Sequence, residues 1–221
     1  MIAQAYSLFR KDLNSELRTR YAVNALAMFI IVAISVILFS IGDEKITPEL
    51  TGGLFWVIIF FTAMSGLSRA FVSEEERGTT LALQLVASPS TIFTGKLIFN
   101  TILVFCMNIV IALLYSTLFE AFVLENFVLF LYSFILGNIG LAVSSTIIAA
   151  IIAKAGAKGT LYPVLSFPIL LPLILTSVRL TIFSMDGISF ERAKFELAIV
   201  LSYDVIMTTA SYMLFEFIWK D

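Results

Sequence analysis

The longest run of consecutive charged side chains lies in one interior loop, residues 73–96. Glu74, Glu75 and Glu76 stand next to one another and are followed directly by Arg77. Such charges cannot enter a bilayer, so they mark its edge. The chemistry they offer is electrostatic, because an acidic cluster can orient a partner that presents basic residues. The alternative is that these residues only mark the membrane boundary.

The residues after this cluster have the pattern of a short capped helix. Gly78 can end a preceding helix in a left-handed conformation, and Thr79 or Thr80 can begin a new one. Leu81 and Leu85 would share one face of that helix, which Pro89 would end. We predict that the segment docks into a groove of a soluble partner through these leucines. The alternative is a solvated loop with a surface turn.

Residues that usually carry catalysis or bind metals are scarce. The chain has no histidine, which removes the commonest general base, the usual haem ligand and most zinc sites. Its single cysteine, Cys106, excludes an intrachain disulfide. The formal net charge of −2 does not favour nucleic-acid binding. We therefore expect no catalytic site and no cofactor or metal bound by this chain.

Two charges and three prolines lie within long apolar segments. Arg179 and Asp204 are the charges set deepest, and ionisable groups at such depth are usually paired. We predict that the two meet in the outer leaflet. Pro163, Pro168 and Pro172 each remove a backbone donor and can kink a helix. They would form either a hinge or lateral opening, or static packing.

The elements that position these residues are predicted to be transmembrane helices. The chain of 221 residues is 60% hydrophobic and 14% charged, whereas soluble domains are about half apolar and a quarter charged. A span requires roughly 20 mostly apolar residues, and six segments approach or reach that length. We predict an all-α, six-span protein with a single domain, residues 1–221. The expected spans are 21–41, 52–72, 97–119, within 127–153, 161–183 and 197–218.

The N-terminal segment, residues 1–20, is predicted to be an amphipathic helix on the membrane surface. Apolar side chains recur there at helical spacing, and a basic stripe opposite them would face lipid headgroups. The alternative is a plain extension of the first span. Six spans place both termini on the same side of the membrane. Ten of the fourteen Lys and Arg residues are expected on that side. This asymmetry predicts that both termini are cytoplasmic.

In order and spacing, these pieces resemble the permeases of ABC-2 exporters, and most closely the haem exporter protein B family, CcmB. The resemblance includes residues 9–13 of the basic segment, the acidic loop ending at residues 85–89, and Gly95 with Lys96. It continues in the paired prolines of residues 164–172 and covers nearly the whole chain. It implies that the acidic loop is the coupling segment for an ATPase. The residues assigned to coupling are Glu74, Glu75, Glu76, Arg77, Gly78, Leu81, Leu85 and Pro89.

The resemblance also implies partners and a location. It implies a permease subunit of cytochrome c maturation in the bacterial plasma (inner) membrane, with a CcmA-like ATPase, CcmC-like and CcmD-like membrane proteins and a CcmE-like haem chaperone. ATP would be bound by the ATPase, since this chain has no Walker-type phosphate loop, and haem would be handled by the complex. Paired ATPase domains imply a homodimer of the permease, surrounded by lipid. The alternatives are an exporter of another amphiphile (drug, lipid or glycan) and a scaffold without transport.

The predicted topology can be tested by labelling. In a Cys106→Ala background, a cysteine introduced at Glu76 should be inaccessible to a membrane-impermeant thiol reagent added to intact cells, because residues 73–96 are expected in the cytoplasm. Labelling of that cysteine from the periplasmic side would contradict the topology.

Overall fold

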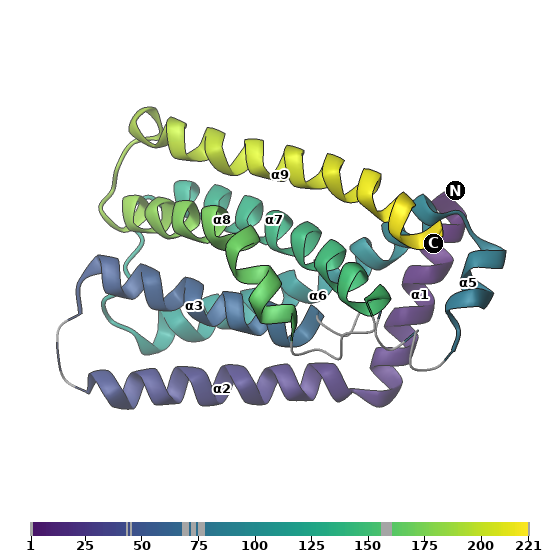
Figure 1. The fold of residues 1–221 in the computed structure, drawn as a ribbon. Helices are drawn as coiled ribbons and strands as arrows, with labels where there is room; N and C mark the ends of the chain where they lie inside the picture. The colour runs from purple at the N-terminus through teal and green to yellow at the C-terminus, as the bar shows by residue number, and fades with distance from the viewer. Residues whose placement is uncertain are drawn as a thin grey trace.

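The computed structural model describes residues 2–42, 44, 46–67, 71, 74, 78–155 and 161–220. That part of the chain forms eight helices and no strand (Figure 1). Six of these helices are long and apolar enough to cross a membrane. The prediction of an all-α protein with six spans is therefore confirmed. The helices are α1 (Ile2–Thr19), α2 (Tyr21–Ile41), α3 (Pro48–Leu67), α5 (Thr80–Val86), α6 (Pro89–Leu118), α7 (Phe127–Lys154), α8 (Leu161–Met185) and α9 (Phe190–Lys220).

Several helices start earlier than their apolar runs do. Helix α3 starts at Pro48 rather than residue 52, and α6 starts at Pro89 with Ser88 as its N-cap. Both prolines occupy the first helical position, where the missing backbone N–H costs nothing. The first two turns of α6 thus occupy the end of the predicted loop 73–96. Helix α9 starts at Phe190 rather than residue 197. Its first two turns are polar and helical, so they precede the apolar run from which the start was predicted.

Helix α7 lies at the centre of the bundle and is the most deeply buried span. It packs against α3, α6, α8 and α9. Two glycines on it permit this close approach. A Cβ atom at Gly137 would overlap the Trp56 ring of α3, and one at Gly140 would lie 2.5 Å from Oδ1 of Asp204 on α9. Small residues let membrane helices approach closely, so these glycines set the spacing of the core.

Both ends of the chain lie at the same end of the bundle, called here the α5 end (Figure 1). Helix α1 runs across this end at a steep angle to α2, and the two join at Arg20, whose φ is 51° (Figure 1). Helix α1 packs on α6 at Gly95, where an added Cβ would lie 2.8 Å from Leu8 and 3.0 Å from the Ala5 carbonyl. Tyr6 and Leu17 remain exposed. The predicted amphipathic helix is present, and its place on a membrane surface stays a prediction.

The glycine at position 137 provides a test of the α3–α7 packing. Gly137→Ala should lower the free energy of unfolding by about 1–3 kcal/mol, because the methyl group would overpack the contact with Trp56. Reversible unfolding in mixed detergent micelles would measure the loss. The matched control is Gly53→Ala in α3, where an added Cβ meets nothing within 4 Å. That variant should be neutral or stabilised by up to about 1 kcal/mol. Equal effects of the two substitutions would contradict the packing argument.

Candidate functional site

Four charged side chains form a neutral cluster at the α5 end. Glu74 Oε1 accepts hydrogen bonds from Lys11 Nζ at 2.5 Å and from Lys96 Nζ at 3.0 Å. Asp12 completes the cluster, with Oδ2 at 3.0 Å from Lys96 Nζ and Oδ1 at 3.3 Å from Lys11 Nζ. These four residues, called here the charge cluster, join α1, the segment before α5 and the first turns of α6.

Two members of the charge cluster, Lys96 and Glu74, are buried as well as paired. Lys96 is 4% exposed and Glu74 is 8% exposed. Lys96 Nζ also lies 5.7 Å from the centre of the Phe71 ring, within the range of a cation–π interaction. A buried charge is tolerated when it is paired and hydrogen-bonded, and removal of one partner leaves the other uncompensated. Both lysines contact both carboxylates, but Lys96 has the larger structural role because it is buried whereas Lys11 is exposed.

The cluster controls the ionisation of Glu74. Burial opposes the charged form, but the charge of Lys96 and the hydrogen bonds from Lys11, Thr79 and Lys96 outweigh it and hold the Glu74 pKa at about 2, below its usual 4.5. Burial likewise opposes the charge of Lys11, yet its hydrogen bond to Glu74 and the nearby carboxylates raise its pKa above 10.5. Glu74 thus contributes stability that is present above pH 4.5 and is lost as the pH falls toward 2. Lys11 contributes stability that is present below pH 10.5 and is lost as the pH rises through its raised value.

Helix α5 is attached to the bundle at both of its ends. At its start, Thr79 donates from its backbone N–H to the Glu74 carbonyl (3.0 Å) and from Oγ1 to Glu74 Oε2 (2.5 Å). Thr79 is the N-cap, as predicted, although its hydroxyl binds Glu74 rather than the first turn of α5. Further along, Gln84 Nε2 donates to the Trp219 carbonyl of α9 at 2.8 Å. These bonds fix α5 against the charge cluster and the end of α9.

The two faces of α5 differ in exposure. Leu85 is 89% exposed and Val86 is 74% exposed, whereas Leu83 packs partly against the core. Leu85 is thus exposed, as a docking anchor has to be, and its contact with a partner stays a prediction. The side chain of Leu81 and residues Glu75, Glu76 and Arg77 lie outside the described part of the structure.

Of the two residues predicted to bound α5, Gly78 has the predicted conformation and Pro89 has a different role. Gly78 has the predicted left-handed conformation, with φ +65°. Helix α5 ends at Val86 with Ala87 as its C-cap, and Pro89 opens α6 instead of closing α5. Only two residues thus separate α5 from α6, so the two helices are tightly connected.

A group of aromatic rings packs together at the α5 end of the bundle. Phe71 lies 5.5 Å from Phe215, which stacks on Trp219 at 5.2 Å, and Phe93 lies 5.0 Å from Phe215. These rings come from the segment before α5, from α6 and from α9. The i, i+4 spacing of Phe215 and Trp219 is visible in the sequence, but their contact with Phe71 depends on how α9 packs.

Sequence reasoning found Glu74 but missed its partners. Lys11 and Asp12 appeared only as part of the basic N-terminal helix, and Lys96 only as part of the resemblance. One signal was available: Lys96 stands at the start of an apolar run of span length, where a buried cation needs an anion. The identity of that anion depends on α1 crossing α6, which has no local sequence signature.

The predicted pair of Arg179 and Asp204 is wrong. Arg179 is exposed, and neither carboxylate oxygen of Asp204 has a hydrogen-bond partner among the described residues. The cause is the early start of α9. Asp204 lies fourteen residues into α9, roughly 21 Å from its start, whereas Arg179 lies six residues, roughly 9 Å, from the end of α8. The two side chains are therefore at different depths.

The three prolines of α8 have different positions. Pro168 and Pro172 lie inside the helix, whereas Pro163 lies in its first turn, where proline is tolerated without a kink. Helix α8 changes direction along its length (Figure 1). Pro168 and Pro172 account for this bend, since each removes a helical hydrogen bond. Pro163 is not expected to contribute to it, contrary to the prediction.

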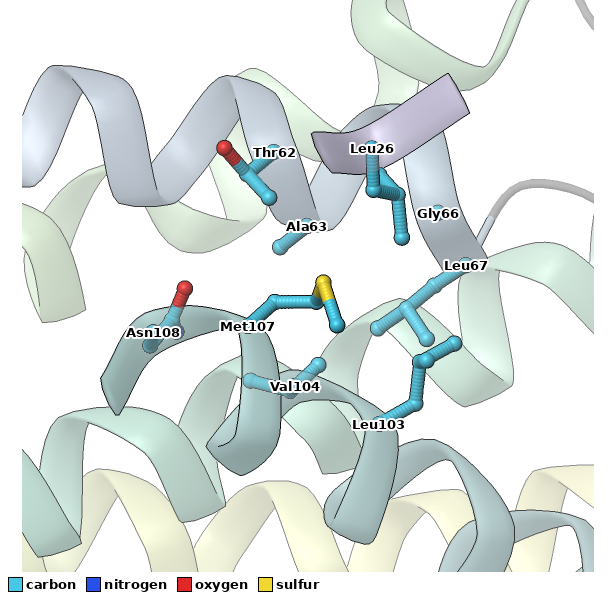
Figure 2. A pocket seen from close by; sticks show the side chains of 9 residues that line it. All are labelled: Leu26, Thr62, Ala63, Gly66, Leu67, Leu103, Val104, Met107 and Asn108. Carbon is cyan, nitrogen blue, oxygen red and sulfur yellow. The ribbon is translucent and has the colours of Figure 1, made fainter. Parts of the chain in front are cut away.

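A small hollow lies between α2, α3 and α6 (Figure 2). Its lining is almost entirely apolar. Thr62 and Asn108 are its polar residues, and Asn108 Nδ2 donates to Asn138 Oδ1 at 2.5 Å. Within the described ranges there is no group of three or more His, Cys, Asp or Glu residues that could hold a metal ion.

Comparison with known families identifies the chain. Residues 3–215 match the sequence model of the CcmB protein family. The chain belongs to the CcmB family. CcmB is the haem exporter protein B family, the permease of a haem-exporting ABC transporter for cytochrome c maturation, and not a family of catalytic enzymes. No curated protein matches this CcmB-family chain.

The charge cluster of this CcmB-family protein can be tested through Lys96. Lys96→Met should lower the free energy of unfolding by about 3 kcal/mol, because Asp12 and Glu74 lose a buried cation. Unfolding in mixed micelles would measure the change. Adding Glu74→Gln should cost less than the two single losses together, since the residues interact directly.

The control for this prediction is Lys194→Met. Lys194 pairs with Glu191 at 3.6 Å, but both side chains are largely exposed, so the substitution should change stability little or not at all. Strict additivity of Lys96→Met and Glu74→Gln would contradict the coupling.

Proposed function

We propose that this chain is the permease subunit to which a separate ATPase couples through α5, within the haem-handling complex of cytochrome c maturation. One observation carries the proposal: α5 is fixed to the bundle on one side and presents Leu85 and Val86 fully to its surroundings on the other. An exposed apolar pair on a short helix fits a groove on a partner protein. Membership of the CcmB family supports an ABC-transporter context for that partner.

The attachment of α5 suits it to transmit force. A displacement of α5 at Leu85 would be transmitted to α1 and α6 through the ion pairs of Glu74 and Lys96. It would be transmitted to α9 through the hydrogen bond from Gln84 to the Trp219 carbonyl. Because the charge cluster and the aromatic rings leave α5 little freedom, motion of the partner moves these helices with it. The acidic residues beside α5 would orient the ATPase by meeting basic residues on its surface.

The distribution of basic residues supports an orientation. Basic side chains at the α5 end include Arg10, Lys11, Arg18, Lys96 and Lys154, against Arg179, Arg192 and Lys194 toward the other end. By the positive-inside rule, the α5 end and both termini face the cytoplasm, in the bacterial inner membrane. Cytoplasmic ATP is then on the correct side for the ATPase. The exposed Tyr6 and Leu17 of α1 would contact lipid.

The partners follow from the family. The ATPase is CcmA-like and carries the ATP, and the complex includes CcmC-like and CcmD-like membrane proteins, a CcmE-like haem chaperone and a second copy of this chain. Haem is the substrate of the complex. The energy of ATP hydrolysis is used for haem delivery or for release of the haem-loaded chaperone, while this chain binds no ATP itself.

Substitution of Leu85 tests the docking role of α5. Leu85→Asp should weaken ATPase binding about 30-fold, because an interface anchor contributes about 2 kcal/mol. The measurement is retention of the ATPase in a mild-detergent pull-down, together with the level of mature cytochrome c. Combination with Leu81→Asp should abolish both if the two leucines share the docking face.

The matched control is Val123→Asp. Val123 is 62% exposed and lies in the turn between α6 and α7, at the end opposite α5. This variant should keep the ATPase at the wild-type level. Retention of the ATPase by a normally inserted Leu85→Asp, Leu81→Asp double variant would show that α5 is not the docking element.

A further inference from the structure

Asp204 is a carboxyl group buried in the middle of the bundle. It is 6% exposed, and both of its carboxyl oxygens lack a hydrogen-bond partner among the described residues. The proposed coupling role does not use this residue. An ionised carboxylate without a partner at membrane depth is among the most costly groups a protein can bury. A specific reason is therefore needed for its presence.

The surroundings of Asp204 are apolar and close. A Cβ atom at Gly140 would lie 2.5 Å from Asp204 Oδ1 and 2.8 and 2.9 Å from the two methyl groups of Leu173. The carboxyl group thus fits a notch on α7 that exists only because residue 140 is a glycine, and Leu173 of α8 borders the same notch. A hydrated cation could not be accommodated in so tight a contact.

No described cation faces Asp204 from the helices that pack against α9. On α7, Lys154 lies at the end of the helix, fourteen residues beyond Gly140. On α8, Arg179 is exposed and six residues beyond Leu173. On α6, Lys96 is held by the charge cluster.

The titratable neighbour of Asp204 is a tyrosine on the same helix. The Tyr203 hydroxyl lies 2.9 Å from Ser144 Oγ and donates to the Ile169 carbonyl at 3.0 Å. Its hydrogen bonds therefore bridge α9 to α7 and α8 and do not balance a charge on Asp204. The other tyrosines on these helices also have partners of their own. Tyr162 of α8 donates to the Ser145 carbonyl, Tyr132 of α7 packs against the Phe190 ring, and the hydroxyl of Tyr212, further along α9, lies 2.9 Å from Thr94 Oγ1.

We infer that Asp204 is a proton-binding site, and that its carboxyl group is protonated while α9 packs against α7 and α8. When the three helices separate and water reaches the group, the O–H bond breaks, the proton passes to water and a carboxylate remains. The packed arrangement then binds one more proton than the separated one. By linkage, a rise in pH favours separation of α9 from α7 and α8.

Four serine hydroxyls on the same three helices support this inference. Each is buried without a hydrogen-bond partner among the described residues: Ser145 on α7, Ser166 and Ser177 on α8, and Ser211 on α9. Unpaired hydroxyls would bind water once the helices part. The three helices that meet at Asp204 therefore contain buried hydroxyls that would be hydrated if the helices separated.

Infrared spectroscopy of the purified full chain in lipid nanodiscs tests the site directly. Exposed Asp and Glu side chains ionise near pH 4, so at about pH 6 they no longer show the C=O stretching band of a protonated carboxylic acid. The wild-type protein should show that band at this pH, and Asp204→Asn should lose it. The control Asp186→Asn, at an exposed position between α8 and α9, should retain it.

A second measurement uses stability and does not depend on the spectrum. The thermal unfolding midpoint of the wild type should fall as the pH rises from about 6 to about 9, because the packed state loses its proton. That of Asp204→Asn should change less over the same range, since the amide cannot ionise. Absence of the band from the wild type at pH 6, its persistence in Asp204→Asn, or identical pH profiles for the two proteins would each overturn the inference. Should Asp204→Asn fail to fold, the wild-type band at pH 6 decides alone.

Discussion

The arrangement of the α5 end depends on one carboxylate held between two lysines. The described counter-charges of Glu74 come from two other helices, since α1 supplies Lys11 and α6 supplies Lys96. Because Lys96 is almost fully buried, neither helix can move away without exposing an unpaired charge to an apolar environment. The position of α1 across the bundle and the position of α5 above it both follow from this requirement. The tight contact at Gly95 then brings α1 close enough to meet it.

Glu74 and Asp204 show how the surroundings set the state of a buried carboxyl group. Glu74 is surrounded by donors and cations, and its pKa of about 2 means that it stays ionised at any physiological pH. Asp204 has Gly140 and Leu173 as neighbours, and no residue of the described ranges forms an ion pair or hydrogen bond with its carboxyl group. The first group is a permanent structural charge, which suits a rigid joint. The second depends on the packing of its helices, which suits a group whose state changes when they move.

The sequence predicts the spans better than it predicts the contacts between them. Apolar runs of span length identify six helices because length and hydropathy are properties of a single segment. The start of α9 at Phe190 was missed because charged turns continue a helix beyond its apolar run. Glu74 could be singled out from its charged run, but Lys11 and Lys96 are 63 and 22 residues away, and their meeting depends on tertiary packing. The pairing expected for Asp204 failed for the same reason, since an error of seven residues in one boundary changes depth by roughly 10 Å.

Helix α9 connects the α5 end of the bundle to Asp204. It is continuous from Phe190 to Lys220, with Asp204 near its middle and the Trp219 carbonyl, which accepts from Gln84 of α5, at its end. A continuous helix is stiff along its axis, so a displacement imposed on α5 is carried along α9 toward the notch at Gly140. The contact there is too close to absorb such a shift by compression, because protein interiors are close-packed. Two events would therefore act on the contact of α9 with α7 and α8. Movement of α5 by an ATPase would shift α9 mechanically, and protonation of Asp204 would stabilise the packed arrangement.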